Sequence, residues 1–206
     1  MFEFISKNKK EIVELADVSV HSYNVKVIAS IIASEMGLDY MERKVISCVG
    51  VYHDIGKGYV KQELLYKPVR LNAKELNEIK RHASLGSEYM KRNKHLRGYA
   101  EFVLLHHENM DGTGYYNLSG DNIPLVSRII RIADYFDAMC TDKTYRDAYT
   151  ICETLNAMEK DLQKFDPAAF KIFINIFEKK KELEGRILLL YGGPFTIQQA
   201  PEYAQI

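Results

Sequence analysis

Apolar residues recur along most of this chain at the spacing of an α-helix, and this periodicity constrains the fold more than any other feature. Ile28, Ile31 and Ile32 fall on one helix face, and the segment from Val45 to His53 continues the rhythm, with His53 on the buried side at its end. The sequence therefore predicts an all-α helical bundle. Further helices are expected over 73–92, 99–107, 125–140, 150–163 and 167–182.

Local signals mark where these helices begin and where the pattern stops. Asn72 followed by Glu75 predicts a capping box, and Asp166–Pro167 predicts a break between two helices. Residues 109–124 are rich in glycine and end in Pro124, which predicts one long structured loop of the kind that often carries function. After Gly185 the sequence suggests a short strand or an extended arm. We expect one helical domain over 1–184 and a short irregular C-terminal tail over 185–206.

Composition narrows the class of protein. The 206 residues are 47% hydrophobic and carry 28 basic and 28 acidic side chains, which argues against a DNA or RNA polymer as partner. No apolar run reaches the ~18 residues of a membrane span, and the N-terminal segment gives no signal-peptide pattern. Three isolated cysteines indicate a reducing cytoplasm and argue against a thiolate zinc site. They are Cys48, Cys140 and Cys152.

Five of the six histidines combine with aspartates in a pattern that indicates metal binding. Imidazoles and carboxylates together hold hydrolytic metal ions, and two adjacent polar residues at the end of an apolar stripe are costly to bury without a role. A helical bundle can bring such side chains into a two-metal centre, with Asp54 as a bridge between the ions. The candidate ligands are His21, His53, Asp54, His82, His106, His107 and Asp134.

The same residues leave other interpretations open. A single buried histidine is usually a core residue with one hydrogen bond, and for His21 alone the two interpretations are about even. Asp134 could instead be an ion-pair partner of Arg128 or Arg131. His95 lies in a charged stretch and is expected to be exposed. Mixed imidazole and carboxylate ligands favour iron, manganese or zinc over magnesium or calcium, without a choice among the three.

Several separated motifs resemble the HD-GYP subgroup of the HD-domain phosphohydrolases. The similarity covers roughly residues 15–150, and the motifs occur in the order found in that family. It implies an all-helical domain of the HD type with bacterial cyclic di-GMP phosphodiesterase activity that forms linear pGpG and then GMP. The motifs are HSYNV (21–25), HDIGK (53–57), HASLG (82–86), HHENMDGTGYYNLSGDNIP (106–124) and RIADYFDAMCTDKTYR (131–146).

The resemblance assigns roles to individual residues. It makes the seven candidate ligands the holders of two divalent transition-metal ions, and Asp54 and Lys57 the catalytic residues. Asp17 stands where the family has an acidic ligand, usually Glu, for a third ion, and the shorter side chain leaves that ion open. The resemblance further implies that Lys143 and Arg146 contact phosphate. Tyr115 could stack on a base, or could simply anchor the loop.

Two motifs depart from the family pattern, and both contain residues that the resemblance assigns to substrate binding. The signature Gly-Tyr-Pro reads Gly114-Tyr115-Tyr116, and Lys143 replaces an arginine, which removes bidentate phosphate geometry. The alternatives are therefore a different cyclic or linear nucleotide as substrate, or a non-catalytic, metal-bound nucleotide-sensing module. Regulatory domains are often fused to members of this family and none fits in this sequence, so we expect regulatory input from a separate protein or from substrate supply. The sequence makes no prediction of the oligomeric state.

Overall fold

The computed structural model describes residues 9–142 and 147–191, with side chains from residue 20 onward. Within these residues the chain forms α-helices and short 3-10 helices and no β-strand, so the prediction of an all-α fold is confirmed. None of these helices has an apolar stretch long enough to cross a bilayer. The α-helices are α1 (Lys9–Glu35), α2 (Tyr40–Tyr52), α3 (Gln62–Leu65), α4 (Ala73–Lys80), α5 (His82–Arg92), α6 (Ala100–Leu104), α7 (Leu125–Cys140), α8 (Ile151–Lys160), α9 (Pro167–Lys179) and α10 (Lys181–Leu188). The 3-10 helices are η1 (Ile55–Tyr59), η2 (Arg97–Tyr99), η3 (Gly120–Asn122), η4 (Leu162–Lys164) and η5 (Leu189–Tyr191).

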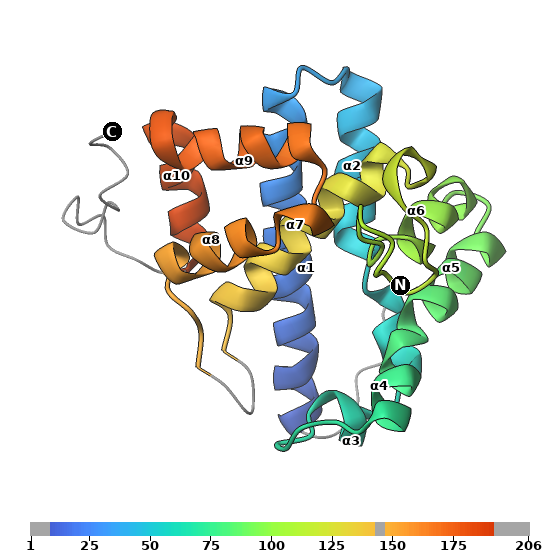
Figure 1. The fold of residues 1–206 in the computed structure, drawn as a ribbon. Coiled ribbons are helices and arrows are strands. Elements are labelled where there is room, and N and C mark those ends of the chain that lie inside the picture. Colours follow the sequence, from blue (N-terminus) through green and yellow to red (C-terminus); the bar gives the residue numbers. More distant parts are fainter. Residues whose placement is uncertain (1–8, 143–146, 192–206) are drawn as a thin grey trace.

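The long helix α1 runs through the middle of the molecule and packs mainly against α2 and α7 (Figure 1). Helices α8, α9 and α10 lie on one side of α1, and α3 to α6 lie on the other (Figure 1). Ile28 and Ile32 of α1, Ile46 of α2 and Phe136 of α7 are fully buried in one apolar core. Each such side chain contributes about 1.5–3 kcal/mol through burial, and this core fixes the three helices that surround the site.

A glycine allows α1 and α2 to approach closely. A Cβ atom at Gly50 would lie 2.7 Å from the Cα atom of Lys26, a distance that real Cβ atoms do not adopt. Helix α2 begins with a capping box between Asp39 and Glu42, and its C-cap residue is His53. The close approach therefore sets the end of α2, with His53, against the middle of α1.

A second glycine seats η1 against α5. A Cβ atom at Gly56 would lie 1.9 Å from the carbonyl oxygen of His82, so only glycine fits this position in the observed packing. Gly56 belongs to the HDIGK motif and lies two residues after Asp54. Its missing side chain thus brings Asp54 next to His82, although the two residues belong to different helical segments.

The single helix predicted over residues 73–92 is two helices. The capping box of Asn72 and Glu75 is present at the start of α4, as the sequence predicted. The chain breaks at Arg81, between α4 and α5. Near the break, the imidazole of His82 donates to the carbonyl of Ile79, and a side-chain bond of this kind competes with the helical ladder. The break turns His82 toward the bundle.

The C-terminal part differs from the sequence prediction in one respect. The break at Asp166–Pro167 is present, because Asp166 caps α9 and Pro167 is its first residue. The chain after Gly185 is neither a strand nor an extended arm up to residue 191, since α10 and η5 are helical there. Ile187 is fully buried in the core, which explains why its apolar stretch folds as a helix against the bundle.

Candidate metal centre

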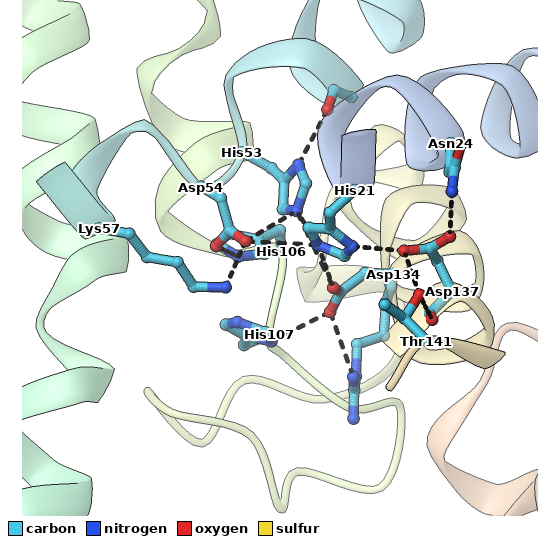
Figure 2. A network of polar contacts seen from close by, with 12 residues as sticks. His21, Asn24, His53, Asp54, Lys57, His106, His107, Asp134, Asp137 and Thr141 are labelled. Carbon is cyan, nitrogen blue, oxygen red and sulfur yellow. Dashed lines mark hydrogen bonds and ion pairs between the residues drawn. The ribbon is translucent and has the colours of Figure 1, made fainter. Parts of the chain in front are cut away.

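Five histidines and two aspartates from separate segments of the chain meet beside α1 (Figure 2 labels all of them except His82). Six of these residues form two groups. Within each group, one nitrogen or oxygen atom from every residue lies within 4.8 Å of the others, and Asp54 belongs to both groups. Asp134 of α7 contacts both of them. The first group is His21, His53 and Asp54, and the second is Asp54, His82, His106 and His107.

The two carboxylates each face both groups. Asp54 Oδ2 lies 3.3 Å from His21 Nε2 and 3.4 Å from His53 Nε2, while its Oδ1 lies 3.3 Å from His82 Nε2. Asp134 Oδ1 lies 3.3 Å from His21 Nε2, and its Oδ2 lies 3.5 Å from His107 Nδ1. This is the arrangement expected of carboxylates that bridge two cations.

Three of the histidines are oriented by the backbone immediately before them. His53 donates its Nδ1 proton to the carbonyl of Gly50 at 2.9 Å, and His106 donates to Val103 at 2.6 Å. His82 donates to Ile79 at 2.8 Å. Because Nδ1 carries the proton in each neutral ring, Nε2 presents a lone pair to the centre. Such an anchored tautomer is usual for histidines that bind metal through Nε2.

The Nε2 lone pairs of His82 and His106 point toward each other, an arrangement that a cation bound between them would stabilise. The Nε2 atoms of His82 and His106 are 3.3 Å apart. Burial, together with the nearby His53 and His82 rings, lowers the pKa of His106 to about 3, and burial also lowers the pKa of His82. Both rings are then neutral, so this contact is not a hydrogen bond. Asp54 Oδ1 is buried without any hydrogen-bond partner. The donor set fits a divalent metal ion.

Lys57 of η1 reaches the same carboxylate from the outer side. Its ammonium group pairs with Asp54 Oδ2, and its side chain is partly exposed. Burial alone would lower the pKa of Lys57, but Asp54 outweighs it and the pKa is raised. For Asp54, burial would raise the pKa, but Lys57 and His53 hold it well below its usual value. Lys57 therefore places a positive charge at the edge of the cluster.

A family comparison matches most of the chain. The model of the HD domain matches residues 3–169. This chain belongs to the HD domain family. The predicted resemblance is thereby confirmed at the level of the family, and the HDIGK segment supplies the His53–Asp54 pair of this HD domain.

The HD domain is similar to curated phosphodiesterases of bacteria. It is 36% identical over 127 residues to the cyclic di-GMP phosphodiesterase response regulator RpfG of Xanthomonas campestris, covering 60% of this chain and 34% of that protein. It is 34% identical over 152 residues to 3'3'-cGAMP-specific phosphodiesterase 3 of Vibrio cholerae, covering 73% of this chain and 33% of that protein. The chain thus spans about a third of the length of these relatives.

A solved structure has the same fold. The HD domain superposes with a TM-score of 0.65 on an HDGYP protein of Bdellovibrio bacteriovorus, covering 84% of this chain and 58% of that chain at 17% identity. A likeness at this identity concerns the fold, and it agrees with the all-α architecture in which the cluster lies.

The glycine-rich loop of this HD domain is organised by Glu108, directly after His107. The Glu108 carboxylate is buried and accepts hydrogen bonds from the backbone N–H groups of Tyr116 and Leu118, both at 2.8 Å. A Cβ atom at Gly114 would lie 2.5 Å from the Cα atom of Glu108, so glycine is required there. Proline, the family residue at position 116, has no N–H group and could not donate this bond. The substitution to tyrosine therefore supplies a bond that holds the loop.

Tyr115 lies beside the second ligand group. Its ring centroid is 4.6 Å from that of His107 and 6.2 Å from that of His82, and the Lys80 ammonium lies 5.0 Å from the Tyr115 centroid. The loop thus places an aromatic ring and a cation next to the cluster.

The other predicted site residues fall into three sets. Lys143, Arg146 and the side chain of Asp17 lie outside the described part of the structure. Asp134 does contact Arg131, at 3.7 Å, but it faces His21 and His107 as well, whereas Arg128 pairs with Asp166. His95 is exposed, as predicted.

Two residues with a clear role in this geometry were not predicted. Glu108 orders the loop, and the fully buried Asp137 accepts a hydrogen bond from His21 Nδ1 at 2.6 Å. The signal for Asp137 was its position three residues after Asp134 on an otherwise apolar helix, where a second carboxylate needs a buried partner. Glu108 adjoins the His106–His107 pair, but its partners are backbone groups that the sequence does not reveal.

Proposed function

We propose that this HD domain is a metal-dependent phosphodiesterase that hydrolyses cyclic di-GMP to linear pGpG, to GMP, or to both. The observation that carries the proposal is the pair of ligand groups that share Asp54, whose buried Oδ1 has no hydrogen-bond partner. The relatives at 36% and 34% identity are named as phosphodiesterases of cyclic dinucleotides, which supports this substrate class.

The proposed cofactors are two divalent transition-metal ions, with iron or manganese favoured and zinc as the alternative. His21 and His53 would hold one ion, and His82, His106 and His107 the other. Asp54 and Asp134 face both groups and would bridge them. Nitrogen-rich sites with carboxylate bridges favour these metals over magnesium. A third ion near Asp17 stays a prediction.

The chain's own residues would act on the substrate around these ions. When bound, the two proposed ions would supply an activated water and would neutralise charge on the phosphate that is attacked. The Lys57 ammonium, paired with Asp54 at the edge of the cluster, would stabilise negative charge on the phosphate or protonate the leaving oxygen. Tyr115 would contact a base, and the predicted contacts of Lys143 and Arg146 with phosphate complete the proposal.

A second candidate substrate is 3'3'-cGAMP, or another cyclic or linear nucleotide. The observation that favours it is the altered loop, in which Tyr116 occupies the proline position and bonds to Glu108. Relatives of similar identity are named for cyclic di-GMP and for 3'3'-cGAMP. A non-catalytic, metal-bound sensing module is the third candidate, and it predicts nucleotide binding without turnover.

The test combines metal analysis with a substrate panel. The full chain is purified, its metal content is measured, and the same sample is incubated with cyclic di-GMP, 3'3'-cGAMP and a linear dinucleotide, with pGpG resolved from GMP. We expect about two ions per chain and cleavage that a chelator abolishes and added metal restores. Metal-loaded protein that leaves every dinucleotide intact would overturn the enzymatic proposal, and binding without cleavage would support the sensing module.

The remaining parts of the proposal concern context. We propose that the domain acts in the cytoplasm, in line with three isolated cysteines that form no C-x-x-C pair. We further propose that a separate protein supplies its regulation. The division into a catalytic unit over 1–184 and a tail over 185–206 is also a proposal, and the helical residues up to Tyr191 belong structurally with the bundle.

A further inference from the structure

Asp137 is a buried carboxylate that touches one candidate ligand and several residues outside the cluster. It accepts hydrogen bonds from His21 Nδ1 at 2.6 Å, Asn24 Nδ2 at 2.8 Å and the Tyr191 hydroxyl at 2.7 Å (Figure 2 shows the first two). The Thr141 hydroxyl lies 3.4 Å from Oδ2. The carboxylate is therefore fixed on both of its oxygens, and its orientation determines that of the His21 ring.

Tyr191 comes from a part of the chain that the family match does not include. The HD domain match ends at residue 169, and Tyr191 lies in η5, after α10. Its ring packs against Phe136 of α7 at 5.9 Å between centroids, which directs the hydroxyl to Asp137. The C-terminal segment thus reaches the centre through a specific polar contact.

His21 differs from three other candidate ligands in how it is oriented. His53, His82 and His106 donate to backbone carbonyls three residues earlier, so bonds that are local in the sequence orient them. His21 donates to a side chain 116 residues away. Its Nε2 faces Asp54 and Asp134 only while that side chain keeps its place.

We propose that η5 is a positioning element of the metal centre, in which Tyr191 orients Asp137 and Asp137 orients His21. The inference rests on the proposed metal binding by His21. Residues that hydrogen-bond to a metal-binding histidine raise its basicity and fix its ring, and their loss typically lowers metal affinity about 10- to 100-fold. Tyr191 acts through Asp137 and touches no candidate ligand itself, so it is a positioning residue rather than a catalytic one.

The test uses Co²⁺ as a spectroscopic probe in the full chain. The visible absorption of bound Co²⁺ reports ligand geometry, and titration gives its affinity. In Tyr191→Phe we expect a changed spectrum and a loss of affinity of about 3- to 10-fold at one of two sites, because one of several bonds to Asp137 is removed. In Asp137→Asn the loss should be about 10- to 100-fold, since the amide is uncharged and has one acceptor oxygen, whereas the carboxylate accepts bonds on both Oδ1 and Oδ2.

A matched control removes a similar bond elsewhere on α7. The Tyr135 hydroxyl donates to Asp161 at 2.9 Å, so Tyr135→Phe should leave the Co²⁺ spectrum and affinity as in the wild type. A melting temperature measured for each metal-free variant separates positioning from general destabilisation. A spectrum and affinity unchanged in Tyr191→Phe, or changed equally in Tyr135→Phe, would overturn the inference.

The outcomes also separate this inference from the proposed function. If the wild-type chain binds no Co²⁺ or other divalent metal, the proposed function fails and the positioning role fails with it. If the wild type binds two ions and Tyr191→Phe binds them identically, only the positioning role fails. With active enzyme, we expect Tyr191→Phe to lower kcat and leave KM for the dinucleotide nearly unchanged.

Discussion

The candidate metal centre and the loop over residues 109–124 adjoin each other but are held by different kinds of interaction. In the centre, three histidines donate to carbonyls three residues earlier in the chain, and the packing of several helical segments brings these histidines together. In the loop, one carboxylate, Glu108, accepts two backbone N–H groups and orders the turn around Tyr115. The centre therefore depends on the packing of several helical segments. The loop depends mainly on the bonds of Glu108, together with the Met110 N–H group, which donates to the Lys164 carbonyl at 3.0 Å, and Arg131, which donates to Asn109 at 2.9 Å.

The difference indicates how such a domain can change its substrate. A change in the loop alters what lies beside the cluster without moving a ligand, because Glu108 and its partners are not candidate ligands. Relatives of comparable identity are named for different cyclic dinucleotides, which agrees with this separation. The experiments below test whether metal binding and substrate binding respond separately.

The largest effect is expected from Asp54→Ala. Because Asp54 faces both ligand groups, its removal should take the metal content from about two ions to nearly none and abolish cleavage. Elemental analysis and product chromatography measure the two outcomes. Asp121→Ala, at an exposed aspartate in the loop region, is the control and should keep both ions. An Asp54→Ala protein that retains one ion in full would contradict the bridging role.

Lys57→Ala tests whether Lys57 acts on the substrate rather than on metal binding. Its ammonium group pairs with Asp54 but is not a metal ligand, so metal content should stay at the wild-type level. Turnover should fall about 100- to 1000-fold, the usual effect of removing a group that stabilises charge in the transition state. Steady-state kinetics and elemental analysis measure this, with exposed Lys61→Ala as the matched control. Metal loss as severe as in Asp54→Ala would show that the assigned role is wrong.

Tyr116→Pro tests the loop alone. Proline removes the N–H group that Glu108 binds, and losing a hydrogen bond to a buried charged acceptor costs about 1–3 kcal/mol. We expect kcat/KM to fall about tenfold or more while metal content stays constant. Tyr116→Phe keeps the N–H group and the ring and loses only the hydrogen bond of the hydroxyl with Ser84, so it should keep most of the wild-type activity. Higher activity in the proline variant would mean that the backbone rigidity given by proline matters more than the hydrogen bond from residue 116 to Glu108.

The smallest effect concerns the pH dependence of the metal-free protein. The pKa of His106 is lowered to about 3 by burial and the neighbouring His53 and His82 rings, against 6.5 for an unperturbed histidine. Below pH 6.5 the unfolded chain therefore binds a proton that the folded chain does not bind at this position. His106 should thus reduce stability progressively as the pH falls from 6.5 toward 3, by up to about 1.4 kcal/mol per pH unit.

Chelator-treated protein measures this effect by denaturant unfolding at several pH values. His106→Asn should lose less stability on acidification than the wild type, whereas His95→Asn, at an exposed histidine, should keep the wild-type slope. The loop contains no histidine, so the effect belongs to the centre. Equal slopes in all three proteins would contradict the lowered pKa.

The sequence predicted the candidate ligands more completely than it predicted the bounds of the helices that carry them. The helical period placed His53 at the buried end of its helix, and the seven candidate ligands are close together in the structure. The break at Arg81 was missed, because the capping signal of Asn72 marks only where a helix starts. The helix through Gly185 was missed as well, since a short apolar run does not by itself distinguish a strand from a buried helix.

The sequence by itself determined the helical fold and the identity of the groups that cluster, because both follow from residue types and their spacing. The tertiary structure decided how groups from distant segments of the chain are held against one another. That Asp54 Oδ1 lacks a partner, that Tyr116 gives Glu108 a bond proline could not give, and that Tyr191 reaches Asp137 across 54 residues depend on the packing of distant segments. Hydrogen-bond geometry is set by that packing, and residue spacing along one chain does not contain it.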